Sequence, residues 1–256
     1  MCGWHGTSPA PARAPTSSSS TASRTPARRG RRCSTSWRAP ARRSGRRWST
    51  SPAAATASRR RRGSARPSPS FAADLADLLD APAVVVGHSL GGGIALQLAL
   101  DRPDLVRGLV LFAPVSTRGL DFVDDATADR LAHPTPEEQR ALLRAAFHRP
   151  PDEATTAALL ATIERAHPNH IEGAARSMRT FHVEDRLHEI RCPVLLIAGD
   201  RDRHVPLRNH LATWAALRRA GLHVEHDAGH VPFVEATTTS ARLVRSLLDE
   251  VARRDG

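Results

Sequence analysis

The first 70 residues lack the side chains from which a hydrophobic core is built. They contain no Val, Leu, Ile or Phe and consist largely of Ser, Thr, Ala, Pro and Arg. They also contain no Asp, Glu or Lys, so their sixteen Arg give this stretch a net charge of +16. A segment of this composition cannot bury enough apolar surface to offset the entropy that folding costs. We therefore predict that this arginine-rich segment, residues 1–70, forms no folded domain of its own.

The chain is also poor in cysteine and in long apolar runs. Its three cysteines, Cys2, Cys33 and Cys192, form neither a metal-ligand spacing nor a disulfide framework. No apolar run approaches the ~18 residues that a membrane-spanning helix needs. These absences predict a protein of a reducing, aqueous compartment, the cytoplasm, that has no membrane segment, no metal and no cofactor.

The formal net charge of +11 would ordinarily suggest nucleic acid as a partner, but the charge is unevenly distributed. Residues 71–256 hold 21 Arg against all 26 acidic residues and so carry a net charge of −5. The excess of positive charge therefore belongs to the arginine-rich segment alone. We expect a small-molecule substrate for residues 71–256 and do not expect them to bind nucleic acid.

Residues 83–101 contain the most informative pattern in the chain. Three consecutive valines, Val84 to Val86, form an apolar β-branched run that is too short for a helix and is typical of a buried strand. From Leu90 the sequence favours a helix, which stops at Asp101-Arg102-Pro103. A tight turn therefore joins a strand to a helix, and its sequence is Gly87-His88-Ser89-Leu90-Gly91.

This pentapeptide matches Gly-x-Ser-x-Gly, in which a serine hydroxyl is raised on a strained strand-to-helix turn. We expect Gly87 and Gly91 to leave room where the turning backbone passes close to its neighbours. The helix directs its amino end toward Ser89, so the Leu90 N–H is available to a developing oxyanion. The alternative is an ordinary glycine-rich turn, because pentapeptide matches also arise by chance.

The rest of the chain alternates between strands and helices. A helix is predicted from residue 71 and strands at residues 105–112, 193–199 and 222–225, with helices at residues 207–219 and through Val251. This alternation indicates an α/β protein with a mostly parallel sheet and flanking helices. Residues 117–182 are largely helical, so we interpret them as a cap inserted into the core of residues 71–116 and 183–256. Two ordinary crossover helices are the alternative, although 66 residues is long for them.

A candidate acid and a candidate base follow the last two strands. Asp202 follows the strand at residues 193–199, at the edge where ligands collect in an open α/β sheet. Asp200 is its rival, and a plain Asp-rich turn is the alternative. His230 lies in a loop beyond the last strand, where it can reach over the sheet edge. His226 precedes it by four residues, but a zinc pair at that spacing needs a helix, and Gly229 favours a loop.

Ser89, Asp202 and His230 occur in the order expected of α/β-hydrolases, and the sequence resembles that family over residues 71–256 but not over residues 1–70. The matching stretches are Gly87-His-Ser-Leu-Gly-Gly92, Gly199-Asp-Arg-Asp-Arg-His-Val-Pro206 and Gly229-His-Val-Pro-Phe-Val-Glu235. The resemblance implies that Ser89 is the nucleophile, His230 its base and Asp202 the acid that orients the imidazole. Leu90 would supply one oxyanion donor. The family's second donor follows a His-Gly strand, for which this chain offers only His5-Gly6.

Three interpretations of the arginine-rich segment compete. One is a basic arm for nucleic acid or anionic surfaces, although its only aromatic residues are Trp4, Trp37 and Trp48. Another is a targeting peptide, although an apolar helical face is missing. We favour a third, in which the segment is translated out of frame. With G or C at third codon positions and TCN serine codons, a shifted frame permits a Val- or Leu-rich strand ending in His-Gly at residues 16–22.

The same shift permits Val-Val-Asp-Val-Pro-Gly-Arg-Gly-His-Gly at residues 47–57. Both stretches resemble segments that α/β-hydrolases carry before the nucleophile, and AT-rich or AGC serine codons would contradict this hypothesis. The relatives' sheet has eight strands and this sequence predicts four, so the strand at Val84 would present an exposed apolar edge. We predict that the chain as printed is inactive or aggregates, and that a frame-corrected chain hydrolyses short p-nitrophenyl esters.

Three functions are compatible with these residues. The first is a serine hydrolase acting on an ester, a lactone or a similar small acyl compound. The second is a haloperoxidase-like enzyme or a C–C bond hydrolase on the same fold, because a fold does not determine a reaction. The third is a non-catalytic nucleic-acid-binding protein that uses the arginine-rich segment.

Overall fold

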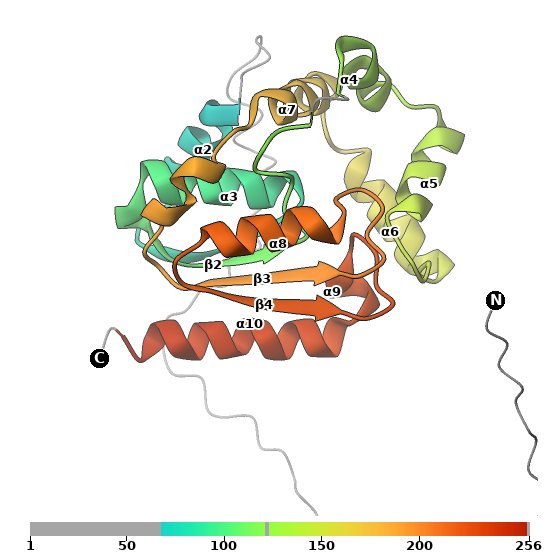
Figure 1. Ribbon diagram of the computed structural model, residues 1–256. Coiled ribbons are helices and arrows are strands. Elements are labelled where there is room, and N and C mark those ends of the chain that lie inside the picture. Colours follow the sequence, from blue (N-terminus) through green and yellow to red (C-terminus); the bar gives the residue numbers. More distant parts are fainter. Residues whose placement is uncertain (1–67, 121–122, 255–256) are drawn as a thin grey trace, which may run out of the picture. The chain divides into compact units, whose positions relative to one another are not determined.

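The computed structural model describes residues 68–120 and 123–254, and their core is one parallel sheet (Figure 1). Its strands are β1 (Ala83–His88), β2 (Val106–Phe112), β3 (Val194–Gly199) and β4 (Ala220–Glu225). They lie side by side in chain order, and every neighbouring pair is parallel. The α/β class with a mostly parallel sheet is therefore confirmed, and four strands stand where the sequence predicts four.

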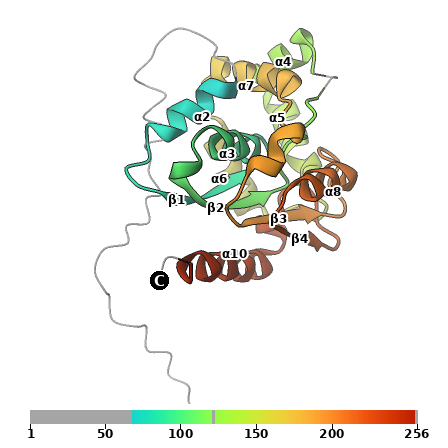
Figure 2. The same cartoon turned by 60° about the vertical axis from the view of Figure 1, so that its left-hand side comes forward.

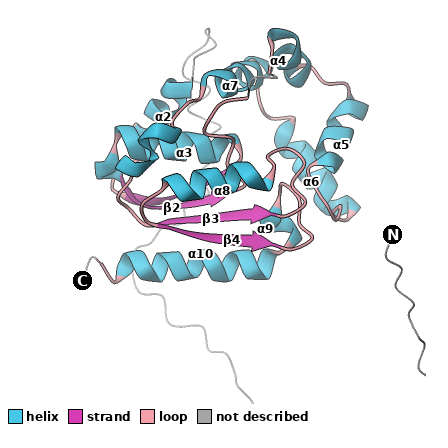
Figure 3. Ribbon diagram, viewed as in Figure 1, coloured by secondary structure: helices cyan, strands magenta, loops and turns pink. Residues whose placement is uncertain are grey.

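Helices cover both faces of this sheet. One face carries α2 (Ser68–Ala76), α3 (Leu90–Asp101) and α8 (Leu207–Ala216), and the opposite face carries α10 (Thr237–Ala252), as Figures 1 and 2 show from two directions. Two short 3-10 helices, η1 (Pro103–Leu105) and η2 (Glu184–Glu189), precede β2 and β3. Figure 3 shows the resulting three layers, with helices on either side of the strands.

The alternation of side chains along β2 divides the core between the two faces. Leu109 and Leu111 join the larger cluster that contains the buried residues of α3. Val110 and Phe112 point the other way and join Leu247 of α10 in a second cluster. Successive strand residues point to opposite faces, so a run that is apolar at every position is buried only when both faces are covered.

The outer edge of β1 is exposed within the described residues. There β1 pairs only with β2, and Val86 has 54% of its surface exposed although it lies in the middle of an apolar strand. An uncovered strand edge is a template for pairing with another chain. The predicted apolar edge is therefore present. The frame-shift hypothesis, the basic arm and the targeting peptide all concern a segment whose residues 1–67 lie outside the described residues.

The long connection between β2 and β3 contains helices α4 (Asp125–Ala132), α5 (Pro136–Ala145), α6 (Glu153–Ile163) and α7 (Pro168–Thr180). Thr135 begins α5 with a capping box, since its hydroxyl accepts from the Glu138 N–H and the Glu138 carboxylate accepts from the Thr135 N–H. Asp124 and Asp152 cap α4 and α6 through one carboxylate oxygen each. Helices α5 and α6 lie on the side to which the strand arrowheads point (Figure 1).

Element boundaries differ from the sequence prediction by a few residues. Helix α2 begins at Ser68, three residues inside the segment predicted to be unstructured. Helix α8 ends at Ala216 and not at residue 219, because the backbone of Leu217 is extended, and beyond it the Trp214 indole N–H donates to the Ala220 carbonyl. No helix in the described part of the chain is both long and apolar enough to cross a membrane.

Candidate active site

Strained backbone marks the carboxyl edge of the sheet. Within the described ranges, three residues other than glycine have positive φ angles: Ser89 at 51°, Ala113 at 41° and Asp227 at 52°. Ser89 follows β1 directly, Ala113 follows β2 directly, and Asp227 comes two residues after β4. Such conformations cost free energy and persist where surrounding contacts hold them, which is typical of functional sites. The strain thus collects at the edge where the sequence predicts the catalytic groups.

The Ser89 backbone is held from both sides. Its N–H donates to the Phe112 carbonyl at 3.0 Å, and its carbonyl accepts from the Gly92 and Val115 N–H groups at 2.9 and 3.0 Å. Helix α3 starts at Leu90, whose N–H has no backbone acceptor among the described residues. The strained turn therefore presents the Ser89 side chain beside the unpaired amide that the sequence assigns to an oxyanion.

The glycines of the turn do not all serve the same purpose. A Cβ on Gly87 would collide with the Gly91 carbonyl oxygen, so Gly87 is required. A Cβ on Gly91 would meet no described atom within 4 Å, so the expected clash at Gly91 is wrong. The crowded glycine of the first turn of α3 is Gly92, which lies against Pro114. A Cβ built on Gly92 would lie 2.8 Å from the Cβ of Pro114.

Alanine substitutions at Gly87 and Gly91 distinguish the effect of a steric clash on stability from the effect of chain entropy. Gly87→Ala is expected to lower the free energy of unfolding by about 3 kcal/mol, because backbone atoms that cannot move aside occupy the Cβ position. Gly91→Ala is expected to be neutral or to stabilise the protein by about 0.5 kcal/mol, because it reduces the entropy of the unfolded chain. Urea unfolding of the two variants measures the difference, and equal losses would contradict this account.

Asp202 and His230 form a buried pair. The Asp202 Oδ2 lies 2.8 Å from His230 Nδ1, and the two residues are 8% and 6% exposed. Asp202 Oδ1 accepts from the backbone N–H groups of His204 and Val205 at 2.8 and 2.9 Å. Burial raises the pKa of Asp202, but the hydrogen bonds from His210 and His230 outweigh it, so that the pKa lies well below its ordinary value.

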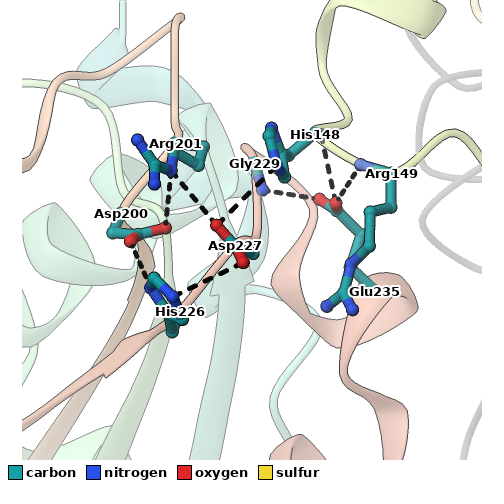
Figure 4. Close-up of polar contacts among 8 residues, drawn as sticks. All are labelled: His148, Arg149, Asp200, Arg201, His226, Asp227, Gly229 and Glu235. Atoms are coloured by element: carbon teal, nitrogen blue, oxygen red, sulfur yellow. Dashed lines mark hydrogen bonds and ion pairs between the residues drawn. The ribbon is translucent and has the colours of Figure 1, made fainter. Parts of the chain in front are cut away.

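Asp200, the rival candidate, has a different histidine partner. Its Oδ2 lies 2.8 Å from His226 Nδ1, and the His226 side chain is mostly exposed. The carboxylates of Asp200 and Asp227 also flank the guanidinium of Arg201, at 3.7 and 3.3 Å from its Nε (Figure 4). The ligand atoms of Asp200, His226 and Asp227 lie within 4.8 Å of one another, but Arg201 already supplies the positive charge that these acids need. His226 and His230 point to separate carboxylates and form no pair.

Sequence reasoning assigned no role to His88, which lies between Gly87 and Ser89. Its Nε2 lies 2.8 Å from the His230 carbonyl oxygen, and because a carbonyl only accepts, this nitrogen carries the proton. The two imidazole centroids are 4.9 Å apart, and the Phe233 ring meets His88 edge-on at 5.1 Å. His88 therefore ties the serine turn to the histidine loop. The only sequence signal is its place in the pentapeptide, at a position that the motif leaves variable.

His88 should make stability depend on pH. Burial, followed by the charge of His230, lowers the pKa of His88 from its ordinary value of 6.5 to about 4. Between these values the unfolded chain binds the proton and the folded protein does not, so stability is lost as pH falls from 6.5 toward 4. We expect the unfolding free energy of the wild type to drop about 2 kcal/mol further than that of His88→Gln between pH 7 and pH 5. Parallel losses in urea titrations would contradict this.

Two more histidines surround the pair without any sequence signal. The His204 ring stacks on His230 with centroids 5.0 Å apart and planes 23° apart. His210 is fully buried on α8, its Nε2 lies 3.5 Å from Asp202 Oδ2, and its Nδ1 has no partner among the described residues. Both residues are distant in sequence from His230, so only folding reveals their proximity to it.

The predicted site residues are brought together to different degrees. Asp202 and His230 are hydrogen-bonded, and Ser89 adjoins a residue that contacts both the ring and the main chain of His230. No hydrogen bond joins the Ser89 hydroxyl to His230 within the described residues. Catalytic hydrogen bonds often tighten only when substrate is bound. His5-Gly6, the candidate for a second oxyanion donor, lies outside the described residues.

The chain is similar in sequence to a known protein family and to individual proteins. The sequence profile of the Alpha/beta hydrolase family matches residues 29–243, so the match begins inside the arginine-rich segment, before residue 71, from which the motifs alone supported a resemblance. The chain is 28% identical over 193 residues to the pimeloyl-(acyl-carrier protein) methyl ester esterase of Neisseria meningitidis serogroup B / serotype 15 (strain H44/76). The aligned region covers 70% of this chain and 74% of that protein.

A second relative and a solved structure are similar in extent. The chain is 32% identical over 177 residues to the 2-hydroxymuconate semialdehyde hydrolase of Pseudomonas putida, covering 65% of this chain and 62% of that protein. The crystal structure of a variant of the meta-cleavage product hydrolase CumD matches with a TM-score of 0.61 and 25% identity, over 74% of this chain and 75% of that one.

Proposed function

Because this chain belongs to the alpha/beta hydrolase family and is a hydrolase, we propose that it cleaves an ester or a similar small acyl compound through Ser89, His230 and Asp202. The observation that carries this proposal is the buried hydrogen bond between Asp202 and His230, at the carboxyl edge of the sheet where Ser89 follows β1 with a φ of 51°. A neutral imidazole that donates Nδ1–H to a carboxylate has Nε2 free to accept a proton. That is the state a general base needs.

The proposed reaction is acyl transfer to the serine. The Ser89 Oγ attacks the acyl carbon while its proton passes to His230 Nε2, and Asp202 stabilises the resulting imidazolium. The Leu90 N–H donates to the oxyanion, a contact worth roughly 3 kcal/mol of barrier. His230 then protonates the departing alcohol. A water molecule next attacks the acyl carbon and gives its proton to His230, which returns a proton to the Ser89 Oγ as the bond to the acid breaks.

A fluorophosphonate probe tests the nucleophile directly, because it phosphonylates only an activated serine. In the frame-corrected chain we expect mass spectrometry to locate the label on the peptide containing Ser89 and short p-nitrophenyl esters to be hydrolysed, whereas the chain as printed should show neither. The chain as printed and the frame-corrected chain are compared side by side. Steeply salt-dependent DNA binding without labelling would favour the nucleic-acid function over a hydrolase.

Cleavage of a C–C bond is a second candidate reaction. Two of the similar proteins bear the names of hydrolases that act on 2-hydroxymuconate semialdehyde and on meta-cleavage products. Parallel assays with p-nitrophenyl acetate and with 2-hydroxymuconate semialdehyde distinguish the two reactions by which compound is consumed. We place the activity in the cytoplasm, because Cys192 is a free thiol and the cysteine spacing supports no disulfide framework.

A further inference from the structure

Glu235 makes three hydrogen bonds to main-chain amides close to the candidate base. It is the last residue of α9 (Pro232–Glu235) and comes five residues after His230. Its Oε1 accepts from the Gly229 N–H at 2.7 Å, and its Oε2 accepts from the His148 and Arg149 N–H groups at 3.0 and 2.7 Å. Figure 4 shows this carboxylate between the two stretches of chain that it joins.

These amides belong to segments that are distant in sequence. Gly229 directly precedes His230, whereas His148 and Arg149 lie in the connection between α5 and α6. The same two segments also meet without Glu235, because the His230 N–H donates to the Ala146 carbonyl at 2.7 Å. Three of these four hydrogen bonds therefore depend on one carboxylate.

The contact is close enough to exclude a side chain. A Cβ on Gly229 would lie 2.6 Å from both the Ala146 carbonyl oxygen and the His148 nitrogen. One further polar contact joins the two segments, between His148 Nε2 and Asp227 Oδ1, and at 3.8 Å it is longer than these four hydrogen bonds. Backbone therefore lies directly on backbone at this point, and Glu235 supplies most of the polar contacts that keep it there.

We propose that Glu235 is a positioning residue that fixes the loop of His230 to residues 146–149. This inference rests on the proposed function, in which His230 is the base. Hydrogen bonds to a carboxylate are stronger than those between neutral groups, so three of them restrain the loop more than the single Ala146 contact does. Glu235 thereby links the α5–α6 connection to Gly229. Because Gly229 is adjacent to His230 in the chain, the imidazole of His230 moves together with that connection.

Glu235→Gln is the informative substitution, since it keeps the size of the side chain. A carboxamide has one accepting oxygen, so either Gly229 or the His148 and Arg149 pair faces an NH₂ group that cannot accept. We expect the amides that lose their acceptor to exchange with solvent about tenfold faster, as measured by NMR. Glu250→Gln is the matched control, because the described contacts of Glu250 are ion pairs with the exposed Arg219 and Arg254 near the end of α10.

The kinetic arm tests whether the contact positions His230. In Glu235→Gln we expect kcat to fall roughly 10²-fold with little change in KM, the usual result when a catalytic group is displaced. The downfield proton resonance of the His230 Nδ1–H bonded to Asp202 should broaden or disappear. Glu235→Asp keeps the charge but is shorter, so its kcat should lie between those of the wild type and Glu235→Gln.

The outcomes separate this proposal from the proposed function. Unchanged amide exchange in Glu235→Gln overturns the proposal, and so does faster exchange with unaltered kcat and an unaltered His230 resonance. A frame-corrected protein without Ser89-dependent turnover overturns the proposed function, even where amide exchange in Glu235→Gln is faster and the contact itself stands. Amide exchange does not depend on activity, so it identifies which of the two has failed.

Discussion

Ser89→Ala in the frame-corrected chain, the parent of every variant assayed for activity, is expected to reduce kcat by roughly 10⁶-fold and to abolish fluorophosphonate labelling. The substitution removes the oxygen that forms the proposed acyl intermediate and leaves the Leu90 N–H in place. The residual rate then comes from oxyanion stabilisation and substrate binding alone. Burst kinetics with a p-nitrophenyl ester measure the loss, since the burst reports formation of the acyl-enzyme.

The control for this substitution is Ser246→Ala on the exposed side of α10. This variant should keep both labelling and turnover at the wild-type level. Comparison of the unfolding curves of the two variants shows whether Ser89→Ala is folded. Turnover that survives in a folded Ser89→Ala protein would assign the chemistry to another group and end the serine hydrolase proposal.

Asp202→Asn is expected to lower kcat by roughly 10⁴-fold. Its Oδ1 would stay with the His204 and Val205 amides, which leaves the new NH₂ group facing His230 Nδ1. That nitrogen must then accept, so the imidazole carries its proton on Nε2 and cannot take one from Ser89. The loss arises from the wrong tautomer and not from a missing contact.

The matched control is Asp200→Asn, which makes the same chemical change two residues earlier. Asp200 pairs with His226 and Arg201, away from His230, so its kcat should stay close to that of the wild type. Steady-state kinetics of both variants on one ester decide between the two acids. A larger loss in Asp200→Asn would reverse their assignment.

Short-range patterns were sufficient for the sheet and for the turn that follows its first strand. The valine run at residues 84–86 forms the predicted strand, but its predicted burial is wrong, because Val86 is 54% exposed at the edge of the described sheet. The glycine-rich turn and the helix follow it directly, as expected. The prediction that a side chain at Gly91 would clash was wrong, because such a clash depends on a tertiary contact. A motif gives the spacing of its glycines but not the side of the helix that meets Pro114, because a partner distant in sequence occupies that side.

The sequence by itself determined the alternation of strands and helices, the strained serine turn and the order of the serine, the acid and the base, since these depend on neighbours along the chain. Only the tertiary structure decided which aspartate meets His230, and only it placed His88, His210 and Glu235 around that histidine. Parallel strands bring their carboxyl ends to one edge. The contacts of His88 and Asp202 with His230, and of Glu235 with the His148 N–H, join residues 142, 28 and 87 positions apart, and no local pattern encodes them.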